Sequence, residues 1–483
     1  MTRDYSGIRE HRPHTYNDLG GCSSDLERDF NKKCLKHADR TFSQGLQCQQ
    51  INSVAALLSL ERSVFILHSP QGCSGCVSMQ ADMYRVGQSH RGITLVKSPR
   101  VIVTNLDQND IVMGGETKLR EAVSLASKRY APELIFIFSS CASGIIGDDI
   151  DAVAIDLQPD TDALIIPIHC DGYRSKICAS GFDSAFISIQ KYILPTERLP
   201  EEKGLVNLFA PTSISYKDQL EIEHMLELIG AKVNYIPFYS SLAKIRKITA
   251  AQASTSICKV FADEFMEDLE QSYGIPYSHT VMPIGVRNTD KWFLGIAEVL
   301  GKEKEAKEYI EREHARILPK LALIKQRLQG KKVFICGGTG RSFAAAALID
   351  DFGMELVGLE TPIYDIDAQI DIEYLNGIHT NFTVDVANMQ PFEQVNLVNK
   401  LKPDVFIGVP TWSARFGIPT THILDSKRPT LGYNGILYLG GKIADQVENP
   451  GFNKKLAPYS RLPYRESWYE ADPFKFIKAY EEV

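Results

Sequence analysis

Short apolar runs alternate with longer amphipathic segments along almost the whole chain. Each run is continuous and rich in β-branched and aromatic residues, so it predicts a parallel strand that is buried on both faces. The runs lie at residues 64–67, 101–103, 134–138, 163–166, 205–209, 333–336 and 404–408. Helical spacing of apolar residues occurs between them, at 116–130, 217–229, 303–328 and 343–352. This order predicts an α/β fold of stacked, doubly wound parallel sheets.

Two polar connectors divide the pattern into three parts. The first is a Pro-rich, charged stretch at 194–200, and the second lies at 329–332. We therefore expect three α/β domains, at residues 1–200, 201–330 and 331–483, which suits a chain of 483 residues. The first 45 and the last 30 residues carry neither pattern, and we expect them to be irregular and on the surface.

Composition and charge exclude several classes of protein. Hydrophobic residues make up 44% of the chain and charged residues 23%, as in ordinary globular proteins and unlike disordered or collagen-like ones. A net charge of −7 provides no general attraction for nucleic acid or for an anionic membrane. The N-terminus lacks the apolar core of a secretory signal, and no apolar run is as long as a membrane span. We expect a cytoplasmic protein whose cysteines stay reduced and act as core residues, redox groups or metal ligands.

Some of the ten cysteines follow predicted strands, at the edge where parallel α/β sheets bind ligands. Cys73 follows the run at 64–67, and Cys141 follows the run at 134–138. Cys73 also forms a C-x-x-C pair with Cys76, which is consistent with a redox dithiol or with half of a zinc site. A zinc site would need a second pair of similar spacing, and the sequence contains none.

Cys48 adds a third thiol upstream of Cys73 and Cys141. All three are expected on separate loops of one domain, and Gly and Ser beside Cys73 and Cys141 allow the backbone to approach a cluster closely. Three such thiolates suit an iron–sulfur centre better than zinc. Because three ligands are an incomplete set, a partner subunit is expected to supply the others.

Three further features carry weaker signals. The loop 337–342 lies between a strand and a helix, where Arg341 adds positive charge, and it is consistent with a nucleotide site or with an ordinary tight turn. Cys336, within the preceding strand, is expected to be a small buried core residue. Cys258 and His422 stand alone in the sequence, and spacing does not pair them.

An ordered set of motifs between residues 45 and 445 resembles the nitrogenase component 1 superfamily. The motifs are His68-Ser69-Pro70-Gln71-Gly72-Cys73, Ser140-Cys141, Ile145-Ile146-Gly147-Asp148-Asp149-Ile150, Cys170-Asp171-Gly172-Tyr173-Arg174, Cys258, Tyr273-Gly274-Ile275-Pro276-Tyr277, Gly353-Met354-Glu355-Leu356-Val357-Gly358, Gly417-Ile418-Pro419, His422 and Gly432-Tyr433-Asn434-Gly435. The resemblance implies three Rossmann-like domains and a heterotetramer of two catalytic and two homologous beta (K-type) subunits. It also implies that a homodimeric, ATP-hydrolysing iron protein delivers electrons.

The resemblance assigns two metal sites. In the family, three cysteines of each subunit hold an eight-iron P-cluster at the subunit interface, and Cys48, Cys73 and Cys141 match them. Only the catalytic (D-type, alpha) subunit also holds a large iron–sulfur cofactor through one Cys and one His, which Cys258 and His422 match; the motifs do not specify its heterometal. Arg341 matches a cofactor-facing arginine. The partner subunit and the dark-operative chlorophyllide reductases lack the Cys and His pair, so the resemblance implies a catalytic subunit.

Departures from the nitrogenase pattern bear on the substrate. Cys178 stands where nitrogenases have Gln, and Phe182 stands where they have a His that donates protons. The lysine that contacts homocitrate has no counterpart in 410–415. These differences argue against dinitrogen reduction, and Phe182 favours an apolar pocket for small uncharged sulfides.

Within the superfamily the chain most resembles methylthio-alkane reductases. These anaerobic enzymes cleave C–S bonds of volatile organic sulfides to methanethiol and a hydrocarbon, for methionine salvage. The alternatives are an alternative nitrogenase catalytic subunit that reduces dinitrogen, and a cofactor-assembly scaffold. Scaffolds of this family usually keep the Cys but not the His. A nucleotide-binding protein that uses loop 337–342 is a further alternative, should the protein contain no iron.

Overall fold

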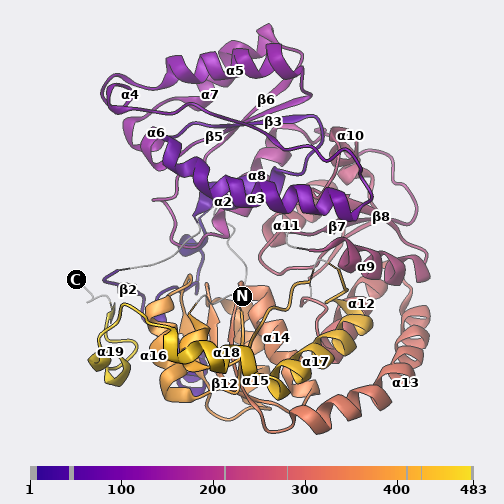
Figure 1. The fold of residues 1–483 in the computed structure, drawn as a ribbon. Helices are drawn as coiled ribbons and strands as arrows, with labels where there is room; N and C mark the ends of the chain where they lie inside the picture. The colour runs from indigo at the N-terminus through magenta and orange to yellow at the C-terminus, as the bar shows by residue number, and fades with distance from the viewer. Residues whose placement is uncertain are drawn as a thin grey trace.

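The computed structural model describes residues 8–42, 48–211, 214–279, 281–408, 412–425 and 427–479. These residues form three α/β units, each built around a sheet with parallel strands (Figure 1). The predicted α/β fold with three Rossmann-like domains is therefore confirmed. No helix within the described ranges combines the length and apolar composition needed to cross a membrane.

The first unit contains a parallel sheet in the order β4-β3-β5-β6. Its strands are β3 (Ser63–Leu67), β4 (Arg100–Val103), β5 (Leu134–Phe138) and β6 (Leu164–Ile168). Every residue of β3 and β5 is buried, as their continuous apolar runs predict. Helices α5 (Glu116–Tyr130) and α7 (Ile150–Leu157) cover one face, while α2 (Gln49–Leu57) and α8 (Ser180–Tyr192) cover the other. Helix α3 (Gln71–His90) runs beside α2, and the short helices α4 (Gln108–Met113) and α6 (Cys141–Ile146) lie at one end (Figure 1).

The second unit contains a parallel sheet in the order β10-β9-β7-β8. Its strands are β7 (Leu205–Phe209), β8 (Lys232–Ile236), β9 (Ala253–Ser256) and β10 (Tyr277–Ser278). Helices α9 (Tyr216–Leu228), α10 (Leu242–Arg246), α11 (Asp263–Tyr273) and α12 (Val286–Leu300) accompany it. The long helix α13 (Glu303–Leu328) has the bounds that its periodicity predicts, and it connects this unit to the third.

The third unit contains a sheet in the order β1-β13-β12-β11-β14-β15. The parallel strands are β11 (Lys332–Cys336), β12 (Glu355–Thr361), β13 (Thr383–Val386), β14 (Val405–Ile407) and β15 (Thr420–Thr421). Helices α14 (Thr339–Asp351), α15 (Ile366–Asn376), α16 (Pro391–Leu401) and α17 (Gly432–Glu448) pack around it. The short helices α18 (Gly451–Leu456) and α19 (Glu466–Glu470) follow near the C-terminus (Figure 1).

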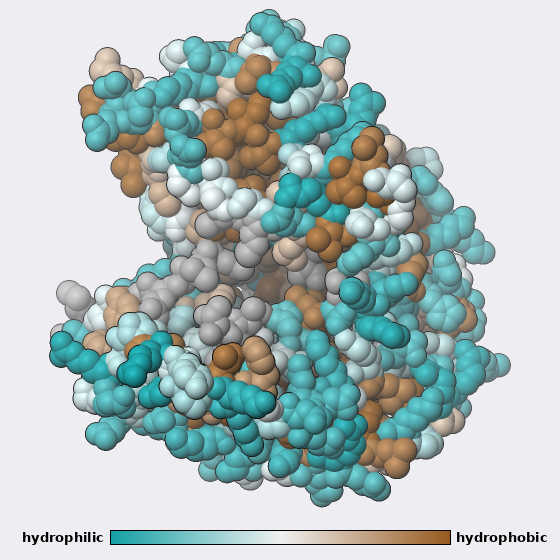
Figure 2. Space-filling view, viewed as in Figure 1, coloured by the Kyte–Doolittle hydropathy of each residue, from teal (hydrophilic) through white to brown (hydrophobic). Residues whose placement is uncertain are grey.

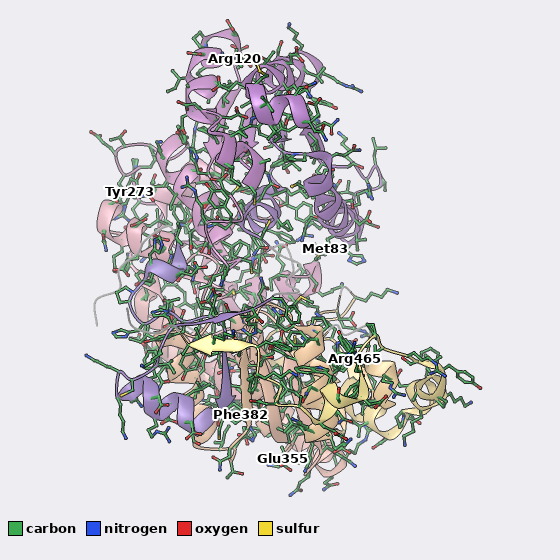
Figure 3. All side chains as sticks on the ribbon, turned by 90° about the vertical axis from the view of Figure 1, so that its left-hand side faces the viewer. Met83, Arg120, Tyr273, Glu355, Phe382 and Arg465 are labelled. Carbon is green, nitrogen blue, oxygen red and sulfur yellow. The ribbon has the colours of Figure 1, made fainter. Side chains whose placement is uncertain are left out.

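The N-terminal segment is more ordered than its sequence pattern predicts. Strand β1 (Leu19–Cys22) pairs antiparallel with β13, helix α1 (Ser23–Asn31) follows it, and β2 (Ala38–Arg40) pairs with β16 (Ile477–Ala479). Figure 3 shows this early part of the chain beside Phe382 of the third unit. An edge strand containing two glycines needs no run of apolar residues, so periodicity misses it. Part of segment 1–200 thus lies on the third sheet.

The surface is mostly polar, but apolar side chains gather on the first unit. Figure 2 shows brown atoms at its left edge, where α4 and α6 lie. Val112 is 80% exposed, Met113 is 83% exposed and Ile145 is 72% exposed. A cluster of large exposed apolar side chains is typical of an interaction surface.

Helix α2 packs very closely against the start of α8 at Gly181. A Cβ atom on Gly181 would lie 2.2 Å from the carbonyl oxygen of Gln49. The Ser53 hydroxyl donates to the Gly181 carbonyl at 2.6 Å, and the Asn52 amide donates to the Cys178 carbonyl at 2.9 Å. The absence of a side chain at Gly181 therefore sets the distance between the two helices.

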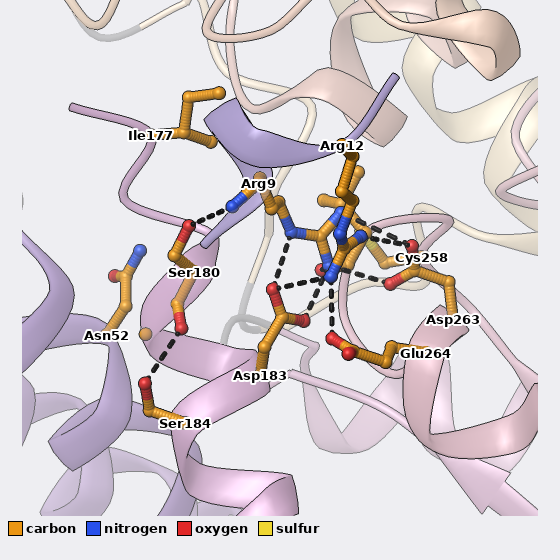
Figure 4. A network of polar contacts seen from close by, with 12 residues as sticks. Arg9, Arg12, Asn52, Ile177, Ser180, Asp183, Ser184, Cys258, Asp263 and Glu264 are labelled. Carbon is orange, nitrogen blue, oxygen red and sulfur yellow. Dashed lines mark hydrogen bonds and ion pairs between the residues drawn. The ribbon is translucent and has the colours of Figure 1, made fainter. Parts of the chain in front are cut away.

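A buried arginine joins α8 to the loop before α11 (Figure 4). Arg9, in the single turn Arg9–His11, is 1% exposed. Its guanidinium bonds Asp183 at 2.8 Å and Asp263 at 2.7 Å, and it donates to the Val260 carbonyl at 3.0 Å. Arg12 adds ion pairs to Asp183 and, at 2.6 Å, to Glu264. The N-terminal segment thus connects the first and second units through charges that are removed from water.

We expect Gly181→Ala to lower the free energy of unfolding by about 1–3 kcal/mol, because the added methyl group forces α2 away from α8. The matched control is Gly441→Ala in α17, where a Cβ meets nothing within 4 Å. There the exchange should leave stability unchanged or raise it by up to about 1 kcal/mol, since Ala is the better helix former. Urea unfolding followed by circular dichroism measures both. Equal effects in the two variants would contradict the close-packing interpretation.

We expect Arg9→Met to lower the free energy of unfolding by about 3–5 kcal/mol, because Asp183 and Asp263 would lose a buried countercharge. Arg28→Met is the control, since Arg28 pairs with Asp25 and Asp29 on the exposed face of α1. It should change stability little, because water screens exposed pairs. Chemical unfolding of both variants tests this, and a tolerated Arg9→Met would show that the network is dispensable.

Candidate functional site

A cavity of about 430 Å³ lies between the three units. Part of its wall comes from α2, α3 and the segment that leads into α8, and the rest comes from loops at the carboxyl ends of strands in the second and third sheets. The loop residues are Pro211 after β7, Cys258 after β9, Gly337 after β11, Pro362 after β12, Ala387 after β13, Gly408 after β14 and His422 after β15. Ligands of parallel α/β sheets bind at this edge, and the volume is typical of a ligand site, at about 300–1,000 Å³.

The cavity brings together residues that lie far apart in the sequence. Cys178, Phe182, Cys258, Arg341 and His422 all line it. Cys258 comes from the second unit and His422 from the third, so the two stand on different walls. Spacing alone does not pair them, and their common cavity is a finding of the tertiary structure.

The Cys258 thiol lies against the start of α14. The backbone N–H of Cys258 donates to the Ser256 hydroxyl at 3.2 Å, and this bond holds the turn after β9. A Cβ on Gly340 would lie 3.1 Å from Cys258 Sγ, so a side chain at Gly340 would crowd the sulfur. Burial raises the pKa of the Cys258 thiol, while the Val260 N–H and the Arg341 guanidinium act in the opposite direction. A bound metal would replace the thiol proton.

Arg341 and His422 place a cation beside a neutral imidazole. Arg341 lies in the first turn of α14, and burial lowers its pKa. The pKa of His422 is lowered to about 4, chiefly by burial and then by the charges of Arg341 and Lys442. The Leu424 N–H donates to His422 Nδ1 at 2.9 Å, so the neutral ring carries its proton on Nε2. A metal that bound Nδ1 would take the place of this backbone donor.

Cys178 and Phe182 supply an apolar part of the wall. The ring of Phe182 packs edge-on against Phe261, with ring centroids 5.0 Å apart. Burial raises the pKa of Cys178 to about 11, so its thiol is neutral at physiological pH. This part of the wall therefore presents an aromatic ring and a neutral thiol, while Arg341 on α14 contributes a guanidinium to the lining.

The donor set fits a large metal–sulfur group better than a single ion. Among the described residues, no three His, Cys, Asp or Glu side chains converge as they do around one metal ion. A thiol and an imidazole on different walls suit a group that spans the cavity. Gly340 leaves room for sulfur beside Cys258, and Arg341 provides positive charge for an anionic cluster.

The three cysteines predicted to hold a P-cluster lie at the beginnings of helices in the first unit. Cys48 directly precedes α2, Cys73 lies in the first turn of α3, and Cys141 begins α6. A Cβ on Gly172 would lie 3.5 Å from Cys48 Sγ and 3.4 Å from Cys141 Sγ, so both sulfurs border one small space. The positive ends of α2 and α3 favour thiolates at Cys48 and Cys73.

Hydrogen bonds hold the loops that carry these cysteines together. The Ser140 hydroxyl donates to the His68 carbonyl at 2.8 Å, which ties the loop before Cys141 to the loop before Cys73. His68 in turn bonds Asp148 at 2.8 Å through Nε2. Cys141 is exposed and Cys48 and Cys73 are partly exposed, so a partner can approach them. The side chain of Cys76 lies outside the described part of the chain.

Sequence reasoning missed one group in the cavity wall. Cys336 ends β11 and lines the cavity instead of being an inert core residue, and Glu360 on β12 lies beside it. Gln394 on α16 bonds Glu360. The sequence did contain a signal for this group, because Glu360 is an acidic residue near the end of the apolar strand β12. In the stretch 410–415, residues 410 and 411 lie outside the described residues.

Comparisons with known proteins identify the family to which this sequence belongs. Residues 48–448 match the family model of nitrogenase component 1 type oxidoreductases. The chain is 29% identical over 381 residues to a nitrogenase iron-molybdenum cofactor biosynthesis protein, NifE, of Methanococcus maripaludis, covering 77% of this chain and 76% of the relative. It is 28% identical over 261 residues to the nitrogenase molybdenum-iron protein alpha chain of Methanosarcina barkeri, and the match covers 53% of this chain and 49% of the relative.

A solved structure shares the fold. It is titled nitrogenase Cp1 at pH 5, and it superimposes with a TM-score of 0.73 and 22% identity, covering 88% of this chain and 92% of that one. The match to the family model extends over most of the described chain and includes every cysteine and the histidine predicted to bind metal. The chain belongs to the nitrogenase component 1 type oxidoreductase family.

Proposed function

We propose that this chain is the catalytic subunit of a nitrogenase-like reductase that cleaves the C–S bonds of methylthio-alkanes in the cytoplasm. The observation that carries the proposal is one cavity that joins Cys258 and His422 and has Phe182 in its wall. The pair supports a catalytic subunit, and the aromatic wall suits an uncharged sulfide. The products are methanethiol and a hydrocarbon.

In this proposal Cys258 and His422 hold a large iron–sulfur cofactor, and Arg341 compensates its negative charge. The cofactor, when bound, supplies electrons at low potential to the substrate. Phe182 and Cys178 line the space that the substrate occupies. The neutral His422 ring is ready to bind a metal without losing a proton, since its pKa is about 4.

Cys48, Cys73 and Cys141 are proposed to hold a P-cluster-type cluster together with a homologous K-type subunit. Their exposure and the apolar side chains on the nearby helices α4 and α6 support a partner at this face. The proposed assembly is a heterotetramer that receives electrons from a homodimeric, ATP-hydrolysing iron protein.

A second candidate function is a scaffold on which a cofactor precursor is assembled. The observation that favours it is the similarity to relatives named as NifE, including one from Clostridium pasteurianum that is 26% identical over 459 residues. His422 in the cavity favours the reductase, because a scaffold that must release its cofactor needs no second anchor.

We expect the complex, purified without oxygen and supplied with its iron protein and ATP, to contain iron and to release methanethiol from dimethyl sulfide and from 2-(methylthio)ethanol. Metal analysis and gas chromatography measure both. Turnover of dinitrogen and acetylene without sulfide cleavage would instead support an alternative nitrogenase.

We expect Cys258→Ala and His422→Ala each to lower C–S cleavage at least about 100-fold and to reduce bound iron, because each removes one anchor of the cofactor. Cys34→Ala is the control, since Cys34 is exposed on the N-terminal segment. Iron content and the electron paramagnetic resonance signal of the complex give readouts that are independent of activity. Full activity and full iron in both cavity variants would refute the proposal that Cys258 and His422 anchor the cofactor.

A further inference from the structure

A buried carboxyl group lies in the cavity wall with only neutral hydrogen-bond partners around it. Glu360 is on β12, directly across from Cys336 on β11 in the parallel register, and it is 1% exposed. Gln394 Nε2 donates to Glu360 Oε2 at 2.7 Å, and the Cys336 thiol forms a second hydrogen bond to the same carboxyl group. Glu360 and Cys336 both line the cavity.

The orientation of Gln394 is determined by Trp412. The indole Nε1–H of Trp412, which can only donate, bonds Gln394 Oε1 at 3.0 Å. The amide nitrogen of Gln394 must therefore face Glu360. Gln394 is 3% exposed and Trp412 is 5% exposed, so water does not compete with this arrangement. The carboxyl group is held at one place in the wall by a rigid, uncharged donor.

Arg40, a cation that acts on Glu360, is already engaged by two other carboxyl groups. Asp385 on β13 and Glu393 on α16 are carboxyl groups, and Arg40 on β2 is paired with them at 2.7 Å and 3.0 Å. Burial raises the pKa of Glu360 to about 7, and the charge of Glu393 acts in the same direction, while the bonds from Gln394 and Cys336 and the charge of Arg40 oppose it. Glu360 is therefore protonated in a large fraction of molecules at neutral pH.

The other titratable groups among the described lining residues cannot readily release a proton at neutral pH. The pKa of Cys178 is about 11, and burial raises the pKa of Cys336 well above its usual value. The guanidinium of Arg341 keeps its protons. Cys258 and His422 are proposed to be occupied by the cofactor. Phe182, where nitrogenases have a proton-donating His, has no proton to give.

We propose that Glu360 is the general acid of this cavity, which donates a proton to the sulfur atom that leaves when a C–S bond is cleaved. This inference rests on the proposed function. Geometry supports it through the position of Glu360 in the wall, the fixed donor Gln394, and the lack of another acid among the described lining residues.

The proton and electron balance of the step is complete. The C–S bond of the sulfide breaks and the substrate takes up two electrons, which come from the reduced iron protein; that protein is oxidised. The Glu360 carboxylic acid gives its proton to sulfur, which forms methanethiol. Water supplies the second proton to carbon, which forms the hydrocarbon, and afterwards returns a proton to the Glu360 carboxylate.

The first test is the pH dependence of the complete complex. A general acid must be protonated, so the wild-type rate of methanethiol release should fall as the pH rises through about 7. Glu360→Gln has the same size and can still accept the Gln394 hydrogen bond, but it has no acidic proton. We expect Glu360→Gln to lower the rate at least about 100-fold and to abolish the fall in rate that the wild type shows as the pH rises through about 7.

Glu393→Gln is the matched control, a buried carboxyl group on α16 that does not line the cavity. Because the charge of Glu393 raises the Glu360 pKa, removing it should shift the fall in rate to lower pH and leave the rate on the acidic side unchanged. Iron content is measured in every variant, so that a lost cofactor is not mistaken for a lost proton donor.

The second test does not depend on turnover. Infrared spectra of the complex without substrate are recorded between pH 5 and 9, and the Glu360→Gln spectrum is subtracted from that of the wild type. We expect the carbonyl band of a protonated carboxylic acid in the difference, which disappears as the pH rises through about 7. The subtraction removes other buried carboxyl groups such as Asp351, whose pKa is also about 7.

The outcomes separate the two proposals. A wild-type complex that releases no methanethiol refutes the proposed function, and the infrared difference still decides whether Glu360 holds a proton. Glu360→Gln with the wild-type rate and pH profile, or a Glu360 that is ionised throughout this pH range, overturns the assignment of Glu360. If Glu360→Gln does not fold, the pH profiles of the wild type and of Glu393→Gln test the assignment. A wild-type rate that does not fall through about pH 7, or a profile that Glu393→Gln leaves unshifted, then overturns it.

Discussion

The cavity depends on charges that are buried between two units of the chain. Arg9 bonds Asp183 on α8 and Asp263 at the start of α11, and all three side chains are almost fully removed from water. A buried carboxylate without a partner is costly, so these residues stabilise the protein only when the N-terminal segment is in place. Asp183 follows Phe182, and Asp263 lies soon after Cys258. The network therefore fixes the two walls of the cavity relative to each other.

The cavity that results has two chemically different sides. Phe182 and Cys178 form a neutral, apolar wall, and Arg341 provides a positive charge near Cys258 and His422. The same positive charge favours the neutral form of the imidazole, which is the form that binds metals. An anionic metal–sulfur group is thus attracted to one side, and the space left over suits a small uncharged molecule.

The relatives include both nitrogenase alpha chains and cofactor biosynthesis proteins, so the family alone does not decide between the two functions. Individual side chains distinguish the proposed reductase from a scaffold. In the proposed reductase, His422 is a second anchor for a cofactor that stays in place. Glu360, held by Gln394 and surrounded by neutral donors and other acids, offers a proton where an apolar wall otherwise provides none. Both residues would be unnecessary in a cavity that only stores and releases a precursor.

Local order could be predicted from the sequence, because strands and helices leave periodic patterns in neighbouring residues. Helices 116–130 and 303–328 have the predicted bounds, and the runs at 64–67 and 134–138 became fully buried parallel strands. The run at 101–103 instead lies in the edge strand β4, which is only partly buried. Their positions after predicted strands marked Cys73 and Cys141 as candidate ligands, whereas only the family resemblance assigned Cys258 and His422. The edge strand Leu19–Cys22 left no such pattern and was missed. Only the tertiary structure brought Cys258 and His422 into one cavity and placed Glu360 among neutral donors. The surroundings of these side chains come from segments that are distant in sequence, so local sequence patterns do not predict them.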